Sequence, residues 1–500
     1  MNVILILFDS LNRHHLSAYD ESPVSTPNID RFAERAWRFN NHFVGSLPCM
    51  PARREIFTGH KEMMWRPWGP LEPSDPRLPR LLEDKGYFTA IVTDHYHYWE
   101  EEANGYIQSF QGSELIRGHE KDFWKQPVSP EEQVPRWVEN IERWRPGWGR
   151  RYYANVKDLE SEEDFFPAKV MTGAIEWLEE NGRKTPFFLQ VESFDVHEPF
   201  HVPEPYASMY NSGEGGSEFT LWPPYQDNEQ LAKFMAATTP EELGYIRSQY
   251  CGKLAMVDRW FGELLDELDE LALWEDTMIV VTTDHGHDLG ERGAFGKQYP
   301  HFDSHANIPL FLWHPENPGN GRAVMALTST VDLFAAILEA AGASSPGPIH
   351  SRSFLPLLSG NGTNAREALL YGTFGQGVCC TDGEWTLFKS PERMEPLYYY
   401  SSMIFKSLIV DSITSPTGHG HYVPNVDLEQ WQVPVKIDST TVARLGQENF
   451  LFNRIEDPEQ NRNLWNEEPS QRKRMIELAR ELMVQEGAPS EQYERLGLGP

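Results

Sequence analysis

A series of short, mostly apolar runs, separated by segments that suit helices, constrains the fold of this sequence more than any other feature. The runs at residues 3–8, 88–93, 186–192 and 277–283 have the length and composition of strands. The first of them is typical of a strand buried in a parallel sheet. Alternation of strands and helices on this scale predicts an α/β fold in which helices sandwich a large, mostly parallel sheet.

Further segments continue the same alternation. A helix is expected at residues 26–33, where a proline lies near the first turn, and an amphipathic helix at about residues 252–271. Residues 308–313 and 326–329 extend the set of predicted strands. The α/β pattern therefore accounts for most of the N-terminal part of the chain.

The character of the sequence changes near residue 365. A stretch rich in Pro, Gly and Ser precedes this point, and short strand-like runs with the spacing of an antiparallel meander follow it, at residues 369–374, 378–381 and 385–389. Alternating charges at about residues 470–485 indicate a surface helix. We therefore expect a large α/β domain over residues 1–365 and a smaller C-terminal α+β domain over residues 366–500.

The charge of the chain limits its partners. A formal net charge of −31 at pH 7 argues against binding to nucleic acid or to an anionic membrane, because both need a basic surface. It also disfavours a large polyanionic substrate. A local basic pocket for one small anion remains compatible with this charge.

The cysteines and the N-terminal run indicate the compartment. The chain has four cysteines, and the adjacent Cys379 and Cys380 can hardly pair with each other without strain, so no disulfide framework is expected. The apolar run at the N-terminus has no basic segment before it and ends at Asp9, unlike a signal peptide. No other run is long enough to span a membrane, and we expect a cytoplasmic protein.

Acidic residues follow two of the predicted strands. Asp9 comes directly after the first strand, and Asp284 and His285 come directly after the run at residues 277–283. Ligands of open α/β sheets bind beyond the carboxyl ends of the strands, so two carboxylates there favour a site for a hard cation. A single aspartate at such a turn is equally typical of a helix N-cap, but that role explains the combination less well.

Residues 49–53 read Cys-Met-Pro-Ala-Arg, and a Thr-Gly pair follows at residues 58–59. A lone cysteine is most often a small buried hydrophobic residue. This stretch, however, resembles the Cys-x-Pro-x-Arg signature of type I sulfatases, which belong to the alkaline phosphatase superfamily. In that family the cysteine is oxidised after translation to formylglycine, whose hydrated aldehyde is the nucleophile.

Other segments resemble sulfatase motifs and occur in the family's order. They are Asp9 after the first strand, a histidine segment at residues 197–206, Asp284-His285-Gly286, Gly-Glu at residues 290–291, Lys297, and a segment at residues 452–464. The last of these is similar to a segment of the smaller C-terminal domain of sulfatases. The resemblance spans nearly the whole chain and implies that residues 1–365 form the catalytic domain.

The resemblance implies a sulfuric ester hydrolase that cleaves R–O–SO₃⁻ to an alcohol and sulfate. It implies a divalent metal, in the first place Ca²⁺, with Mn²⁺ or Mg²⁺ as alternatives because an imidazole suits softer ions. The expected ligands are Asp9, Ser10, Cys49 as formylglycine, Asp284 and His285. Ser10 stands where many sulfatases have a second acidic residue, so the metal shell is expected to be thinner or completed differently.

The resemblance also implies roles for the remaining site residues. Arg53 would orient the modified residue 49, and Lys297 would contact the sulfate group and its bridging oxygen. His197 would be the general acid for the leaving group. The family's usual lysine after the second strand is missing, and either His95 or His97 would replace it as a contact of the anion. Asp284 is the candidate base.

Two alternatives remain open at this stage. Ser10 and His285 are also typical of phosphonate monoester and phosphodiester hydrolases, which use the same machinery. The first alternative is therefore a hydrolase of such phosphorus esters. The second is a non-catalytic binding protein with an unmodified Cys49. The expected partners are a small sulfate ester and a formylglycine-generating maturation enzyme, and the sequence does not indicate the oligomeric state.

Overall fold

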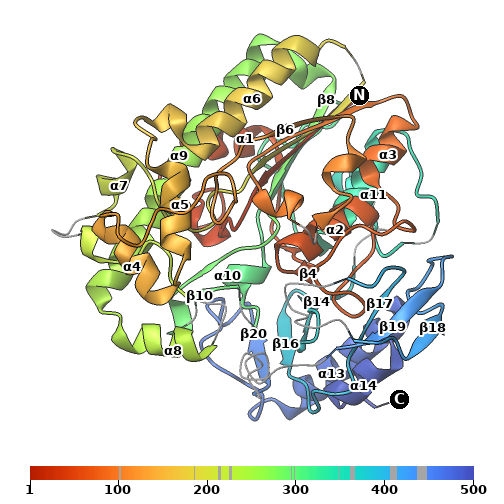
Figure 1. The fold of residues 1–500 in the computed structure, drawn as a ribbon. Coiled ribbons are helices and arrows are strands. Elements are labelled where there is room, and N and C mark those ends of the chain that lie inside the picture. The colour runs from red at the N-terminus through yellow and green to blue at the C-terminus, as the bar shows by residue number, and fades with distance from the viewer. Residues whose placement is uncertain are drawn as a thin grey trace.

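The structure, a computed structural model, shows a large sheet between two layers of helices and a smaller C-terminal sheet with its own helices (Figure 1). The elements below rest on the residues that the structure describes, which are 1–100, 103–184, 186–211, 216–224, 228–293, 295–297, 299–347, 349–360, 366–405, 414–435 and 448–499.

Among these residues, the central sheet has eight strands in the order β12-β2-β11-β8-β1-β7-β5-β6. Their bounds are β1 (Asn2–Phe8), β2 (Trp37–Phe39), β5 (Phe88–Thr93), β6 (Gly112–Leu115), β7 (Phe187–Ser193), β8 (Thr277–Thr282), β11 (Leu310–Trp313) and β12 (Ala323–Val324). Strands β8, β1, β7, β5 and β6 are parallel, and β11 runs antiparallel to both β8 and β2. The predicted mostly parallel sheet is confirmed.

One predicted strand lies elsewhere. Only Thr328–Ser329 of the expected strand at residues 326–329 is extended, as β13, and it pairs with β3 (His42–Phe43) in a separate two-stranded sheet. The prediction that this segment extends the main set of strands was therefore wrong. A short apolar run does not reveal which neighbour it will pair with, because pairing depends on the path of distant segments.

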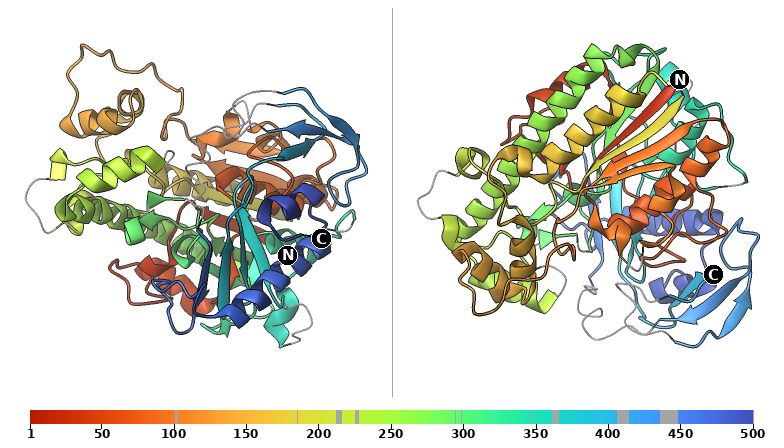
Figure 2. Two further views of the ribbon diagram at one scale, coloured as in Figure 1. Left: turned by 90° about the horizontal axis from the view of Figure 1, so that it is seen from below. Right: turned by 45° about the horizontal axis from the view of Figure 1, so that its top comes forward.

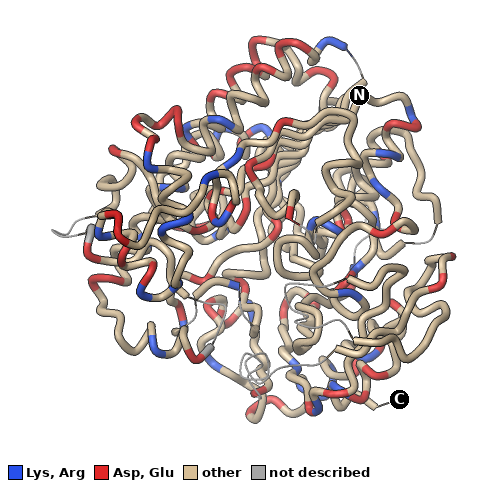
Figure 3. Tube along the Cα trace, viewed as in Figure 1, with Lys and Arg blue, Asp and Glu red and all other residues tan. Residues whose placement is uncertain are grey.

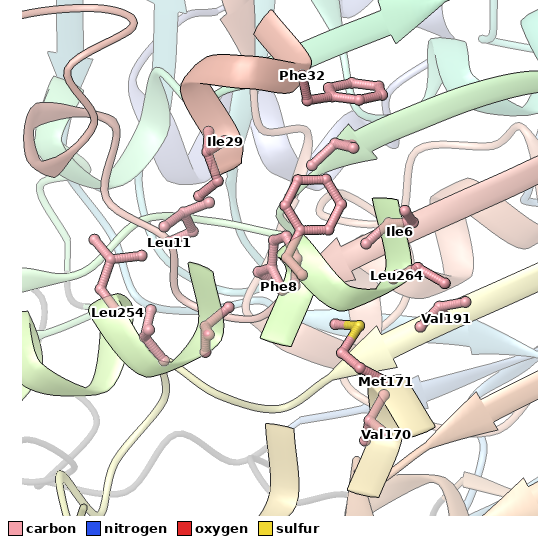
Figure 4. Close-up of a cluster of buried hydrophobic side chains, with 14 of the residues drawn as sticks. Ile6, Phe8, Leu11, Ile29, Phe32, Val170, Met171, Val191, Leu254 and Leu264 are labelled. Carbon is pink, nitrogen blue, oxygen red and sulfur yellow. The ribbon is translucent and has the colours of Figure 1, made fainter. Parts of the chain in front are cut away.

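One face of the central sheet packs against helices α1 (Pro27–Arg35), α6 (Phe166–Asn181) and α9 (Pro240–Glu270). Ile6 and Phe8 of β1 lie in one buried cluster with Phe32 of α1, Met171 of α6 and Leu264 of α9 (Figure 4). The predicted amphipathic helix at residues 252–271 is the second half of α9. The helix begins earlier because Thr239 caps it, its side chain accepting a hydrogen bond from the Glu242 N–H at 3.1 Å.

The opposite face packs against α2 (Cys49–Thr58), α3 (Leu78–Glu83) and α11 (Asp332–Ala340). Val3, Leu5 and Leu7 of β1 point to this face, since side chains alternate along a strand. Burial on both faces explains why the first run is apolar throughout. The right-hand view of Figure 2 shows the twisted sheet between the two layers.

The C-terminal part contains the expected antiparallel meander (Figure 2, left). Its strands are β14 (Leu369–Thr373), β15 (Val378–Thr381), β16 (Trp385–Lys389) and β20 (Phe450–Asn453). Helix α13 (Pro469–Glu486), predicted at residues 470–485, buries Met475, Ala479 and Met483 under this sheet. The residues around the predicted domain boundary, 361–365, lie outside the described part of the chain.

The small sheet also includes a strand from the N-terminal part, which the sequence did not indicate. Strand β4 (Ser46–Leu47) pairs in parallel with β14, with Ser46 opposite Gly372. This strand lies immediately before α2, so the C-terminal sheet helps to place the start of that helix.

The remaining elements are short helices and strands outside the two main sheets. Besides short 3-10 turns they are α4 (Arg136–Trp144), α5 (Trp148–Val156), α7 (Tyr206–Met209), α8 (Asn228–Ala237), α10 (Asp303–Ala306), α14 (Ser490–Leu496), β9 (Asp288–Leu289), β10 (Phe295–Gly296), β17 (Tyr398–Ser401), β18 (Gly418–Gly420) and β19 (Gln430–Pro434). Acidic positions are spread over the outer helices instead of forming one patch (Figure 3). Within the described residues, we find no helix with the length and apolar character needed to cross a bilayer.

Candidate active site

Two carboxylates meet at the carboxyl ends of neighbouring parallel strands. Asp9 directly follows β1, and Asp284 lies just after β8, which pairs with β1. Both side chains are at most 1% exposed. The Ser10 hydroxyl donates to Asp9 Oδ1 at 2.7 Å, and the Ser10 N–H points to Asp284 Oδ1 at 3.3 Å. The structure thus brings the two aspartates together, with Ser10 beside them.

Cys49 is the first residue of α2, and a buried glutamate ties the helix to the strand before it. Glu55 Oε1 accepts a hydrogen bond from the Ser46 N–H of β4 at 2.7 Å. A Cβ at position 45 would overlap the Glu55 carboxylate, so Gly45 permits the close approach. Burial raises the pKa of Glu55 to about 8. These contacts fix the position of the helix start and hence of Cys49.

Arg53 lies one turn after Cys49 and binds three buried carboxylates. Its Nη1 donates to Asp284 Oδ2 at 2.6 Å, its Nη2 to Asp9 Oδ2 at 2.9 Å, and its Nε to Glu192 Oε1 at 2.7 Å. Nη1 also donates to the Cys49 carbonyl at 3.0 Å. The planar guanidinium thus fixes the two strand ends and the start of α2 relative to one another.

Glu192 was missed by the sequence analysis. It is the penultimate residue of β7, the strand between β1 and β5, and its second oxygen accepts hydrogen bonds from Tyr98 and Gln190 at 2.8 and 2.7 Å. A glutamate inside a buried strand is costly unless it is paired. That cost was the one signal in the sequence that pointed to Glu192.

Four side chains present metal-ligating atoms to one another. One atom each from Asp9, Cys49, Asp284 and His285 lies within 4.8 Å of the others, and all four side chains are buried. His285 Nε2 lies 3.2 Å from Cys49 Sγ, while its Nδ1 contacts the Gly286 carbonyl at 2.9 Å. Two carboxylates, an imidazole and residue 49 form a donor set that fits a divalent cation.

Lys297 faces this cluster from the segment after β10. Its Nζ lies 3.7 Å from Cys49 Sγ and 4.0 Å from Asp9 Oδ1. Burial by itself would raise the pKa of Asp9, but Arg53, Lys297 and His285 hold it well below its ordinary value. Burial, and next the Asp9 carboxylate, raise the pKa of the Cys49 thiol. Positive charge therefore surrounds Asp9 on several sides.

The two histidines after β5 take different positions. His95 Nε2 lies 3.5 Å from Asp9 Oδ2, and neither of its ring nitrogens has a hydrogen-bond partner among the described residues. His97 turns to two glutamates, with Nδ1 on Glu100 and Nε2 3.7 Å from Glu120. The structure thus brings His95, and not His97, to the metal-ligating cluster.

His197 lies in the loop after β7 and is held from several sides. Its Nδ1 contacts the Glu198 carbonyl at 2.8 Å, and its ring stacks on Phe194 with centroids 4.2 Å apart. Lys253 of α9 donates to the carbonyls of His197 and Pro199 at 2.8 and 2.7 Å. Burial, followed by the charge of Lys297, lowers the pKa of His197 well below its usual value. Nε2 is the ring nitrogen that remains to meet a ligand.

Comparison with known proteins identifies the family. The sulfatase family model matches residues 1–343, more than half of the sequence. The chain belongs to the sulfatase family. This sulfatase is therefore an enzyme of the sulfuric ester hydrolase class, with a mixed α/β fold.

Similar proteins act on more than one kind of ester, to judge by their names. The multifunctional alkaline phosphatase superfamily protein PehA of Trinickia caryophylli is 26% identical to this sulfatase over 415 residues, which are 74% of this chain and 79% of that protein. Human iduronate 2-sulfatase is 27% identical over 398 residues, covering 72% and 68%. The crystal structure of a phosphonate monoester hydrolase from Agrobacterium radiobacter shares the fold, with a TM-score of 0.67, 20% identity and coverage of 97% and 96%.

Proposed function

We propose that this sulfatase hydrolyses a small sulfate ester to an alcohol and sulfate, using formylglycine formed from Cys49 as the nucleophile. The observation that carries the proposal is the position of Cys49, at the first residue of α2 and beside His285 and Lys297. The N-terminus of a helix favours an anion, since its N–H groups and dipole point there. A sulfate group at this point would meet Lys297 directly.

The proposed metal is a divalent cation held by Asp9, Asp284, His285 and the modified residue 49, with the Ser10 hydroxyl as a further candidate ligand. The two carboxylates favour Ca²⁺, and the imidazole keeps Mn²⁺ and Mg²⁺ as alternatives. When bound, the ion would supply positive charge that polarises the ester and activates a hydroxyl on residue 49.

The residues around position 49 have proposed roles that follow from their positions. Arg53 orients the start of α2, Lys297 contacts the sulfate group and the bridging oxygen, and His95 contacts the anion on the side of Asp9. Asp284 accepts a proton from the attacking hydroxyl, and His197 gives one to the leaving oxygen. A hydrated aldehyde also supplies a second hydroxyl, whose deprotonation releases sulfate by cleavage of a C–O bond.

A phosphonate monoester or phosphodiester is the second candidate substrate. Ser10 in place of a second acid and His285 as a ligand motivate it, as does the similarity to the phosphonate monoester hydrolase. The test is to express the protein with a formylglycine-generating enzyme and compare kcat/KM for 4-nitrophenyl sulfate and an aryl phosphonate monoester. We expect a higher value for the sulfate, and a strong phosphonate preference would replace the first proposal with the second.

Intact-mass analysis of the same sample tests the modification. Conversion of Cys49 to formylglycine lowers the mass by a fixed amount, and peptide mapping assigns the change to residue 49. An unmodified, inactive protein after expression with the maturation enzyme would favour a non-catalytic binding role for the chain.

Metal removal is expected to abolish turnover. Without the cation, Asp9 and Asp284 lie in one buried cluster in which Arg53 and Lys297 are their charged partners, and the polarising charge is lost. We expect kcat/KM to fall by about 10³-fold after dialysis against a chelator, since metal ions supply several kcal/mol of transition-state stabilisation. Restoration by Ca²⁺, Mn²⁺ or Mg²⁺, tested separately with metal analysis, identifies the ion. Full activity in metal-free protein would contradict the proposal.

We also infer a cytoplasmic location and two domains, 1–365 and 366–500. All four cysteines are buried and free, which suits a reducing compartment. The C-terminal strands and α13 share one buried cluster, which Met63, Met64 and Trp65 of the N-terminal part also join, and β4 pairs with β14 of the C-terminal sheet.

A further inference from the structure

A buried carboxylate lies beside the proposed general acid and has no role in the site described above. Glu198 Oε2 lies 3.0 Å from His197 Nδ1, and Glu198 Oε1 lies 3.5 Å from His287 Nε2. All three residues are at most 2% exposed. Neither Glu198 oxygen makes a hydrogen bond among the described residues, so the two imidazoles are its close polar neighbours without the geometry of a hydrogen bond. A buried carboxylate in this state is costly unless a cation comes close to it.

We propose that Glu198 is a positioning residue that keeps a proton on His197 Nδ1, stabilises the imidazolium form and leaves Nε2 as the proton donor to the leaving oxygen. The inference rests on the proposed role of His197 as general acid. A carboxylate beside one imidazole nitrogen orients the ring, selects its tautomer and stabilises its protonated form.

The surroundings of His197 make such a partner necessary. The ring lies against Phe194, and the nearest ammonium groups are those of Lys253, which donates to the His197 carbonyl, and Lys297. Lys253 is itself paired with Asp195, so its charge is already compensated. Burial and Lys297 disfavour a protonated imidazole, and the Glu198 carboxylate, 3.0 Å from Nδ1, is placed where its charge would oppose them.

The proton balance of the step is simple. As the bond between the bridging oxygen and sulfur breaks, its electron pair stays on that oxygen, which takes the proton from His197 Nε2. The imidazole becomes neutral and retains its Nδ1 proton next to Glu198. Before the next turnover Nε2 regains a proton from solvent, which balances the proton that Asp284 takes from the attacking hydroxyl and returns to solvent.

A leaving-group series tests the inference. Glu198→Gln keeps the shape but removes the charge. For phenyl sulfate, whose leaving group needs protonation, we expect kcat to fall on the order of 10- to 100-fold with KM nearly unchanged, because a carboxylate that orients a histidine has effects of that size. For 4-nitrophenyl sulfate, whose leaving group needs little assistance, we expect less than about a threefold change. If phosphonate esters are the better substrates, the same two aryl leaving groups are compared on phosphonate esters instead.

The double variant with His197→Gln sharpens the test. If Glu198 acts through His197, the double variant is no slower on phenyl sulfate than His197→Gln alone. Glu198→Asp keeps a carboxylate and is expected to recover part of the rate, which also covers the case in which Glu198→Gln does not fold. Glu204→Gln is the matched control, because Glu204 also precedes a proline in this loop but is exposed and bonded to Ser208.

The outcomes separate this inference from the proposed function. An equal loss on both substrates in Glu198→Gln, with a lowered melting temperature, would show a structural role only. If the loss of kcat is larger on phenyl sulfate than on 4-nitrophenyl sulfate in His197→Gln but not in Glu198→Gln, the inference is overturned and His197 remains the acid. If neither variant loses more kcat on phenyl sulfate than on 4-nitrophenyl sulfate, the acid role of His197 itself is overturned.

Discussion

Cys49→Ala is expected to lower kcat/KM by about 10⁵-fold or more, the effect seen when a covalent nucleophile is removed from a preorganised site. Residue 49 lies 3.2 Å from His285 and 3.7 Å from Lys297, which is the place that the proposed nucleophile would occupy. Alanine keeps the helix start, because the turn before it is held by Glu55 and Ser46. The free energy of unfolding should therefore fall by only about 1 kcal/mol.

The measurement is steady-state kinetics on an aryl sulfate, together with thermal unfolding and metal analysis. Cys251→Ala is the matched control, since Cys251 is also buried and free but lies on α9. It is expected to keep the activity of the unaltered enzyme. Residual activity of Cys49→Ala within tenfold of that enzyme would exclude a covalent role for residue 49.

Arg53→Met is expected to have the second largest effect, on both stability and activity. It removes the one cation that binds Asp9, Glu192 and Asp284 together, all of them fully buried. Removing one partner from a buried ion pair typically costs about 3–5 kcal/mol, because the other charge remains buried and unpaired. The loss should be largest in metal-free protein, where the three carboxylates repel one another most strongly.

The kcat/KM of Arg53→Met should also fall, by about 10³-fold, since a shift of the start of α2 displaces residue 49 from Lys297. Arg54→Met is the control. Arg54 is the next residue and equally buried, but it binds Glu62 and the carbonyls of Pro67 and Pro70. We expect Arg54→Met to lose stability while its folded fraction keeps its metal affinity and kcat. Equal effects of both variants on kcat would argue that Arg53 acts only through stability.

Much of the fold followed from local patterns. The apolar runs became β1, β5, β7, β8 and β11 because each is long enough for one strand and buried on two faces. The C-terminal meander followed from short runs with regular spacing. The pairing of β4 with β14 did not, because two residues carry too little pattern to predict a partner more than 300 positions away.

The residues of the site also fall into those that local patterns predict and those that they do not. Cys49 and Arg53 share a helix face through their spacing, and Asp9 and Asp284 meet because each follows a parallel strand. The choice between His95 and His97 depended on the path of the chain after β5, which no periodicity encodes.

The sequence by itself determined the family, the strand ends that carry the acids, and the position of the proposed nucleophile, since these depend on local spacing and on motifs. Only the tertiary structure decided that Glu192 binds Arg53 and that Glu198 lies against His197 and His287. The physical reason is that a buried carboxylate is stabilised by cations and N–H groups from distant segments. Strand order and loop paths bring those segments together, and neither can be read from the residues next to the carboxylate.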